Sequence, residues 1–78
     1  MNLKWVKRDD TYIEAYLGPW HVITLIKEGV IWYWYSELPF STTQYNGRRF
    51  GKHTSPKRAA LEAQRSTEEW LRKAGLTN

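Results

Sequence analysis

The sequence predicts an α+β fold, an antiparallel β-meander of three to five strands with one C-terminal α-helix packed on one face. In the first half, short segments rich in β-branched and aromatic residues alternate with turn-forming dipeptides. The second half changes to a helical period after a serine and a proline that are typical of a helix start. The 78 residues have the length of one domain, with a sheet region at 1–52 and a helix with its entry loop at 53–76.

Turn signals divide the first half into four expected strands. The breaks are Asp9-Asp10, Gly18-Pro19, Glu28-Gly29 and, further along, Asn46-Gly47, a dipeptide that strongly favours a two-residue hairpin. The segments LKWVKR, TYIEAYL, WHVITLIK and VIWYWYSE lie around the first three breaks. Residues 38–50 form either a further hairpin or a long loop, because Pro39 argues against a central strand at their beginning.

The expected helix has Ser55 as its N-cap and Pro56 at its first position, and Gly75 ends it. The side chains on its apolar face are small in the first half of the helix and larger in the second. The residues on this face are Ala59, Ala60, Ala63, Thr67, Trp70, Leu71 and Ala74. The alanines allow the helix axis to approach the sheet closely.

Strand alternation predicts an aromatic surface on the side of the sheet that the helix leaves open. Trp32 and Trp34 fall on one side of their strand, and Tyr33 and Tyr35 on the other. We assign the tryptophans to the helix-covered core and the tyrosines, with Tyr12, Glu14 and Tyr16 of a neighbouring strand, to the open face. This face is a protein-binding hot spot, a platform for stacked bases, or a set of strand tyrosines whose hydroxyls are simply hydrated.

Positive charge is concentrated in one segment of a chain whose net charge is +4. Residues 38–61 carry five Lys or Arg and no Asp or Glu. The members of this segment are Arg48, Arg49, Lys52, Lys57 and Arg58, with His53 beside them. They form a candidate binding site for an anion, either the phosphates of a nucleic acid or an acidic protein surface.

Two of these cations lie at an unfavourable place. Lys57 and Arg58 occupy the first turn of the expected helix, where the helix dipole disfavours positive charge by about 0.3–1 kcal/mol each. One explanation is that Arg58 pairs with Glu62 and that the cost is small in water. The other is that these side chains and the helix N-terminus bind an anion together.

Residues 51–63, GKHTSPKRAALEA, resemble the beginning of the last helix of double-stranded-RNA-binding domains. In that family a glycine-containing loop leads into a lysine-rich helix start that holds phosphates. The resemblance implies the same role for Lys57 and Arg58, and less securely for Lys52. Pro56 takes the place of the first lysine in the family motif.

The size and layout of the chain are similar to those of small proteins encoded by phages and mobile elements, including some anti-CRISPR proteins. The resemblance implies a stoichiometric inhibitor that binds and occludes a host nucleoprotein complex. We therefore expect a non-enzymatic binding module of this kind. The alternatives are a nucleic-acid-binding protein that contacts phosphates through residues 48–58 and a structural homodimer that buries the tyrosine face.

Several other classes of function have little support in the sequence. There is no cysteine, which excludes disulfides, thiolate zinc sites and thiol nucleophiles. No apolar run has the length of a membrane span, and the N-terminus lacks the apolar core of a signal peptide, so we expect a cytoplasmic protein without a membrane partner. We interpret His21 as a satisfied strand histidine and His53 as a solvated loop residue, and expect no catalytic site, metal or cofactor.

Overall fold

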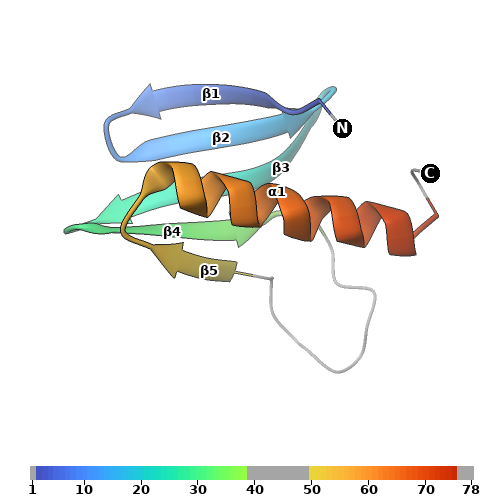
Figure 1. The fold of residues 1–78 in the computed structure, drawn as a ribbon. Helices are drawn as coiled ribbons and strands as arrows, with labels where there is room; N and C mark the ends of the chain where they lie inside the picture. The colour runs from blue at the N-terminus through green and yellow to red at the C-terminus, as the bar shows by residue number, and fades with distance from the viewer. Residues whose placement is uncertain (1, 39–49, 76–78) are drawn as a thin grey trace.

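The computed structural model describes residues 2–38 and 50–75, which form a five-stranded antiparallel sheet followed by one helix (Figure 1). The elements are β1 (Lys4–Asp9), β2 (Tyr12–Leu17), β3 (Trp20–Glu28), β4 (Ile31–Ser36), β5 (Phe50–His53) and α1 (Pro56–Lys73). Each strand pairs with the next one in the chain, and the sheet order is β1-β2-β3-β4-β5. The predicted meander with a C-terminal helix is therefore confirmed.

The turn signals locate the first four strands to within one residue. The Asp9 carboxylate accepts hydrogen bonds from the backbone N–H of Thr11 at 2.7 Å and from its hydroxyl at 2.8 Å, as expected of an Asx turn. Gly18 and Gly29 have φ values of 60° and 63°, which favour glycine. Residues 38–50, for which the sequence left a hairpin or a loop open, end at Phe50, the first residue of β5. The dipeptide Asn46-Gly47 lies outside the described residues.

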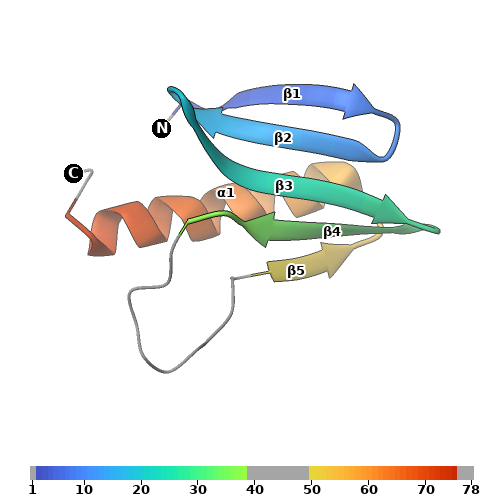
Figure 2. The same cartoon turned by 180° about the vertical axis from the view of Figure 1, so that it is seen from behind.

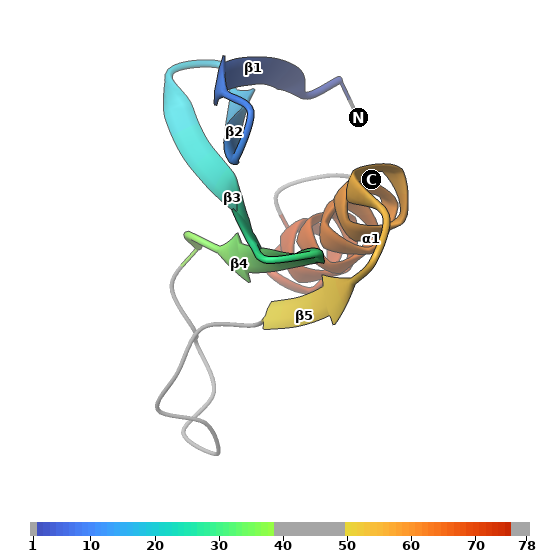
Figure 3. The same cartoon turned by 90° about the vertical axis from the view of Figure 1, so that its left-hand side faces the viewer.

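The helix covers one face of the sheet and contacts β3, β4 and β5 (Figure 1). Figure 3 shows that the sheet curls, with β1 and β2 turned away from β4 and β5 and the helix on the inner side. Among the described residues, no helix lies over the opposite face, which is seen in Figure 2.

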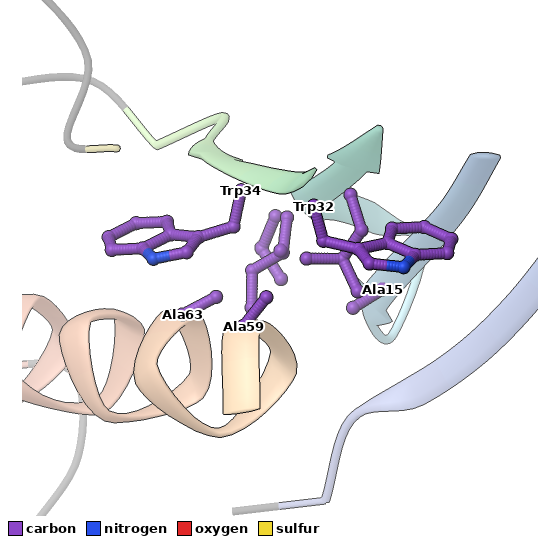
Figure 4. Packing of buried hydrophobic residues seen from close by; sticks show 8 residues of the cluster. Ala15, Trp32, Trp34, Ala59 and Ala63 are labelled. Atoms are coloured by element: carbon purple, nitrogen blue, oxygen red, sulfur yellow. The ribbon is translucent and has the colours of Figure 1, made fainter. Parts of the chain in front are cut away.

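The core lies between the helix and the central strands. Trp32 and Trp34 are buried, at 7% and 4% exposure, and the fully buried Ala59 and Ala63 face them from the helix (Figure 4). Small alanines bring the helix axis close enough for the indoles to fill the space. Each buried indole contributes at most about 4–6 kcal/mol at 25 cal/mol/Å². The assignment of the tryptophans to the covered face is confirmed.

The helix begins and ends at the expected residues. The Ser55 side chain accepts from the backbone N–H of Arg58 at 3.4 Å, Pro56 is the first helical residue, and Gly75 follows the C-cap with φ 75°. The prediction that Ala74 belongs to the face packed on the sheet is wrong, because this residue lies past the last helical position and is exposed. Within the part of the chain that the structure describes, no helix combines the length and apolar character needed to cross a membrane.

Candidate functional site

Two rows of cross-strand neighbours build the open face of the sheet. One row is Tyr12, Ile26, Tyr33 and Lys52, and the next row is Glu14, Thr24, Tyr35 and Phe50. Because alternate residues of a strand point to the same side, the tyrosines of β4 lie opposite its buried tryptophans. The open face therefore contains the predicted tyrosines, and it divides into a polar half over β1–β3 and an aromatic half over β4–β5.

The polar half is organised around the Glu14 carboxylate, whose side chain is only 12% exposed. Its Oε1 accepts from Arg8 Nε at 2.6 Å and from the Tyr16 hydroxyl at 3.1 Å, and its Oε2 accepts from the Tyr12 hydroxyl at 3.2 Å. The hydrogen bond from Arg8 is the main cause that lowers the pKa of Glu14. Tyr12 and Tyr16 are thus held in a local charge network, which leaves their hydroxyls less free for a partner.

His21 belongs to the same polar half, and its ring lies against that of Tyr16 with the centroids 5.3 Å apart. Its Nε2 is 2.9 Å from the Ile23 carbonyl oxygen, 2.9 Å from Thr24 Oγ1 and 3.7 Å from Glu14 Oε2. All three oxygens approach one ring nitrogen, whereas a catalytic triad uses one nitrogen for the nucleophile and the other for the orienting carboxylate. His21 is the satisfied strand histidine that we expected. Among the described residues, no cluster of three or more His, Asp or Glu side chains could hold a metal.

The aromatic half is formed by Tyr33, Tyr35, Phe50 and Lys52, which we call the β4–β5 platform. The rings of Tyr35 and Phe50 are stacked across the two strands, with centroids 6.2 Å apart and planes inclined by 26°. Phe50 is 67% exposed although it is a large apolar residue. Tyr33 lies one row along, directly opposite the exposed Lys52. This surface combines one exposed ring, two half-buried tyrosines and a cation.

Sequence reasoning missed Phe50 as a site residue. The residue ends the segment for which hairpin and loop remained open, so its side chain could not be assigned to a face. Phe50 lies two positions before Lys52. Strand alternation would therefore have placed both side chains on the same face of the sheet. The pairing of Phe50 with Tyr35 comes only from the register of β5 on β4.

The structure separates the predicted basic segment into parts. Lys52 belongs to the β4–β5 platform, and Lys57 and Arg58 lie exposed at the start of α1. Arg48 and Arg49 lie outside the described residues. Of the three predicted cations that the structure describes, Lys52 alone lies on the aromatic face.

His53 differs from the expected solvated loop residue, and that interpretation is wrong. The residue ends β5 with its imidazole on the helix side, where Nε2 lies 2.6 Å from Glu62 Oε2. The other oxygen of Glu62 accepts from Trp34 Nε1 at 2.9 Å. These two contacts, first that of Trp34 and then that of His53, lower the pKa of Glu62. We call this group of three residues the Glu62 clamp, because it joins the helix to β4 and β5.

The Glu62 clamp also removes the expected partner of Arg58. The first turn of α1 contains no acidic residue, and the Glu62 carboxylate faces the sheet. Within residues 2–38 and 50–75, neither Lys57 nor Arg58 makes an ion pair. The explanation that Glu62 compensates Arg58 is therefore wrong, and both cations at the positive end of the helix lack an acidic partner among the described residues.

We compared the chain with protein-family models, with curated protein sequences and with solved structures, and none of the three comparisons found a match. The β4–β5 platform and the helix start are consequently the features from which we infer a function.

Proposed function

We propose that this protein is a non-enzymatic module that binds nucleic acid through the β4–β5 platform. The supporting observation is that Lys52, a member of the acid-free basic segment, lies on the same uncovered face as Tyr33, Tyr35 and the exposed Phe50. Nucleic acids offer both complements, namely phosphates for a cation and bases for aromatic rings.

Charge distribution supports the same proposal. Glu14, the acid in the middle of the open face, is paired with Arg8, so the polar half does not repel a phosphate strongly. Lys52 is exposed and makes no ion pair with any residue that the structure describes. Lys57 and Arg58 supply further positive charge beyond the end of β5. An anion that approaches this end of the molecule meets cations that no described acidic residue neutralises.

Fluorescence anisotropy with labelled DNA and RNA at about 50 and 200 mM salt tests the proposal. Lys52→Gln and the charge reversal Lys57→Glu/Arg58→Glu are expected to weaken binding and to reduce its salt dependence, because each lost phosphate contact lowers the slope of log K against log salt by about 0.7–0.9. The matched control is Arg72→Glu/Lys73→Glu, which makes the same charge change in the last turn of α1.

Two results would count against nucleic-acid binding. One is the absence of binding to every DNA and RNA at the lower salt concentration. The other is an equal loss of affinity in the control, which would mean that net charge alone drives the association.

A second candidate function is the expected inhibitor of a host nucleic-acid-handling complex. It is favoured by large aromatic side chains that are exposed to solvent, since Phe50 is 67% and Trp20 62% exposed. Aromatic side chains of this kind are typical anchors of protein interfaces. In this role the protein would occupy a surface that the host complex uses for its own nucleic acid.

Nuclease-treated host extract separates this role from direct binding. The inhibitor function predicts that the wild-type protein retains a nucleic-acid-handling complex and that Phe50→Ala does not, while Leu61→Ala controls for general stickiness. Retention that disappears with nuclease treatment would assign the contact to nucleic acid. Sedimentation at micromolar concentration tests the homodimer, which a monomer at all concentrations would exclude.

A further inference from the structure

We infer that the β4–β5 platform selects unpaired bases of a single strand over a duplex. This inference rests on the proposed nucleic-acid binding and specifies the state of the ligand. It is drawn from the spacing of the two tyrosines along β4 and from the exposure of Phe50.

The spacing of the two tyrosine positions along β4 matches a strand whose bases are not stacked on each other. Tyr33 and Tyr35 lie two positions apart on the same face of β4, which places them about 6.8 Å apart along the strand. In a duplex, successive nucleotides of one strand advance by about 3.4 Å. Neighbouring bases that contact both tyrosines must therefore be separated to about twice their helical spacing. A single strand can be extended in this way, whereas a duplex loses its stacking.

The exposure of the rings leads to the same conclusion. Tyr35 and Phe50 already form a stacked pair across β4 and β5, and Phe50 remains 67% exposed. An aromatic ring gains from a base only if the base offers its face, and in the interior of a duplex both faces are covered by neighbouring base pairs. The stacked pair can thus accept a base from an open strand but none from the interior of a duplex.

The salt dependence of binding separates a single strand on the platform from a duplex. Among the residues that the structure describes, Lys52 is the cation of the platform, and Lys57 and Arg58 lie at the helix start. With one to three phosphate contacts, the slope of log K against log salt for a single strand is about −0.7 to −2. A duplex held by all five cations of the basic segment would give about −4.5. The salt dependence therefore distinguishes the two modes.

The test uses three labelled probes of about 12 nucleotides, a length within the range of known single-strand sites. They are a single strand, the duplex of the same sequence, and an abasic strand with the same sugar-phosphate backbone. We expect the single strand to bind tightest, with the shallow salt slope given above. Both the duplex and the abasic strand are expected to bind more weakly, because each lacks accessible base faces.

A matched pair of variants assigns the effect to the platform. Phe50→Leu keeps an apolar side chain but removes the π-face, and it is expected to weaken single-strand binding by about 5- to 150-fold without changing the abasic strand. Trp20→Leu is the control, since Trp20 is 62% exposed but lies at the beginning of β3. Phe50 has little burial to lose, so both variants are expected to fold.

The results separate this inference from the proposed function. Equal affinity for duplex and single strand, or unchanged binding of Phe50→Leu, overturns the inference while nucleic-acid binding stands. Equal affinity for the abasic strand also overturns it, because bases would then contribute nothing. Failure of all three probes to bind refutes the proposed function itself, and the inference falls with it.

Discussion

Replacement of Gly51 by alanine is expected to destabilise the protein through the Glu62 clamp. A Cβ atom at this position in β5 would lie 2.4 Å from Glu62 Oε1, 2.4 Å from Trp34 Nε1 and 2.9 Å from Trp34 Cε2. The backbone of Gly51 has no positive φ, so alanine is excluded by these side chains and not by its own conformation. The two atoms closest to the added Cβ are the two partners of one hydrogen bond.

The magnitude follows from three contributions. Overpacking against the buried indole costs about 1–3 kcal/mol. The hydrogen bond to a charged acceptor contributes about 1.5–3 kcal/mol, with the lower end more appropriate because the Glu62 side chain is 47% exposed. Alanine restricts the unfolded chain and recovers about 0.4–1 kcal/mol. Since the first two share atoms and do not add in full, we expect a net loss of about 2–3 kcal/mol.

Urea denaturation followed by tryptophan fluorescence measures the change in unfolding free energy of Gly51→Ala. In a domain of this size, the expected loss corresponds to a decrease in Tm of about 10–20 °C. The same substitution in a Glu62→Ala background is expected to cost at least about 1 kcal/mol less, because one obstructing atom and the hydrogen bond are already gone. If Gly51→Ala changes stability by less than about 0.5 kcal/mol, or costs the same in both backgrounds, the Glu62 clamp does not exclude a Cβ atom at this position.

Three further predictions concern the helix and the two paired carboxylates. Ser55→Ala removes the acceptor for the N–H of Arg58 and is expected to lower the unfolding free energy by about 1 kcal/mol in urea denaturation; an unchanged value would contradict the cap. The pKa values of Glu62 and Glu14 lie below the ordinary 4.5, so their stabilisation is present above that pH and is lost as the pH falls through the folded-state pKa. Glu62→Gln is expected to flatten this acid-induced loss, and an equally steep loss in the variant would assign it to other groups. Lys57→Glu/Arg58→Glu is expected to raise stability by about 0.3–1 kcal/mol per residue, because acids suit a helix N-terminus, while nucleic-acid affinity falls; lower stability in thermal melts would show that these cations serve the fold.

The opposite expected effects of that last substitution connect the helix start to function. A pair of cations that destabilises its own helix and lacks a described acidic partner is not explained by folding. If the charge reversal stabilises the fold and weakens binding, Lys57 and Arg58 are retained for the ligand. If the charge reversal raises both stability and affinity, Lys57 and Arg58 are not part of the binding surface.

The sequence by itself determined the first four strands and the helix of this fold. Turn dipeptides such as Gly18-Pro19, the alternation in β4, and the Ser55-Pro56 helix start are signals between neighbouring residues, and each is read without knowledge of the rest of the chain. The choice of buried face followed as well, because the pairing of two tryptophans with small alanines suits a close approach of helix and sheet.

Only the tertiary structure decided which side chains meet. Glu62 bonds to Trp34 across 28 residues, and this contact turned the carboxylate away from its expected partner Arg58. Phe50 joined the aromatic face through the register of β5 on β4, for which the sequence around it contained no signal. Long-range contacts depend on the register and packing of whole elements. These in turn depend on side chains that are far apart in the sequence. The local pattern therefore predicted four strands and the helix, whereas β5, the platform and the clamp depend on how these elements pack together.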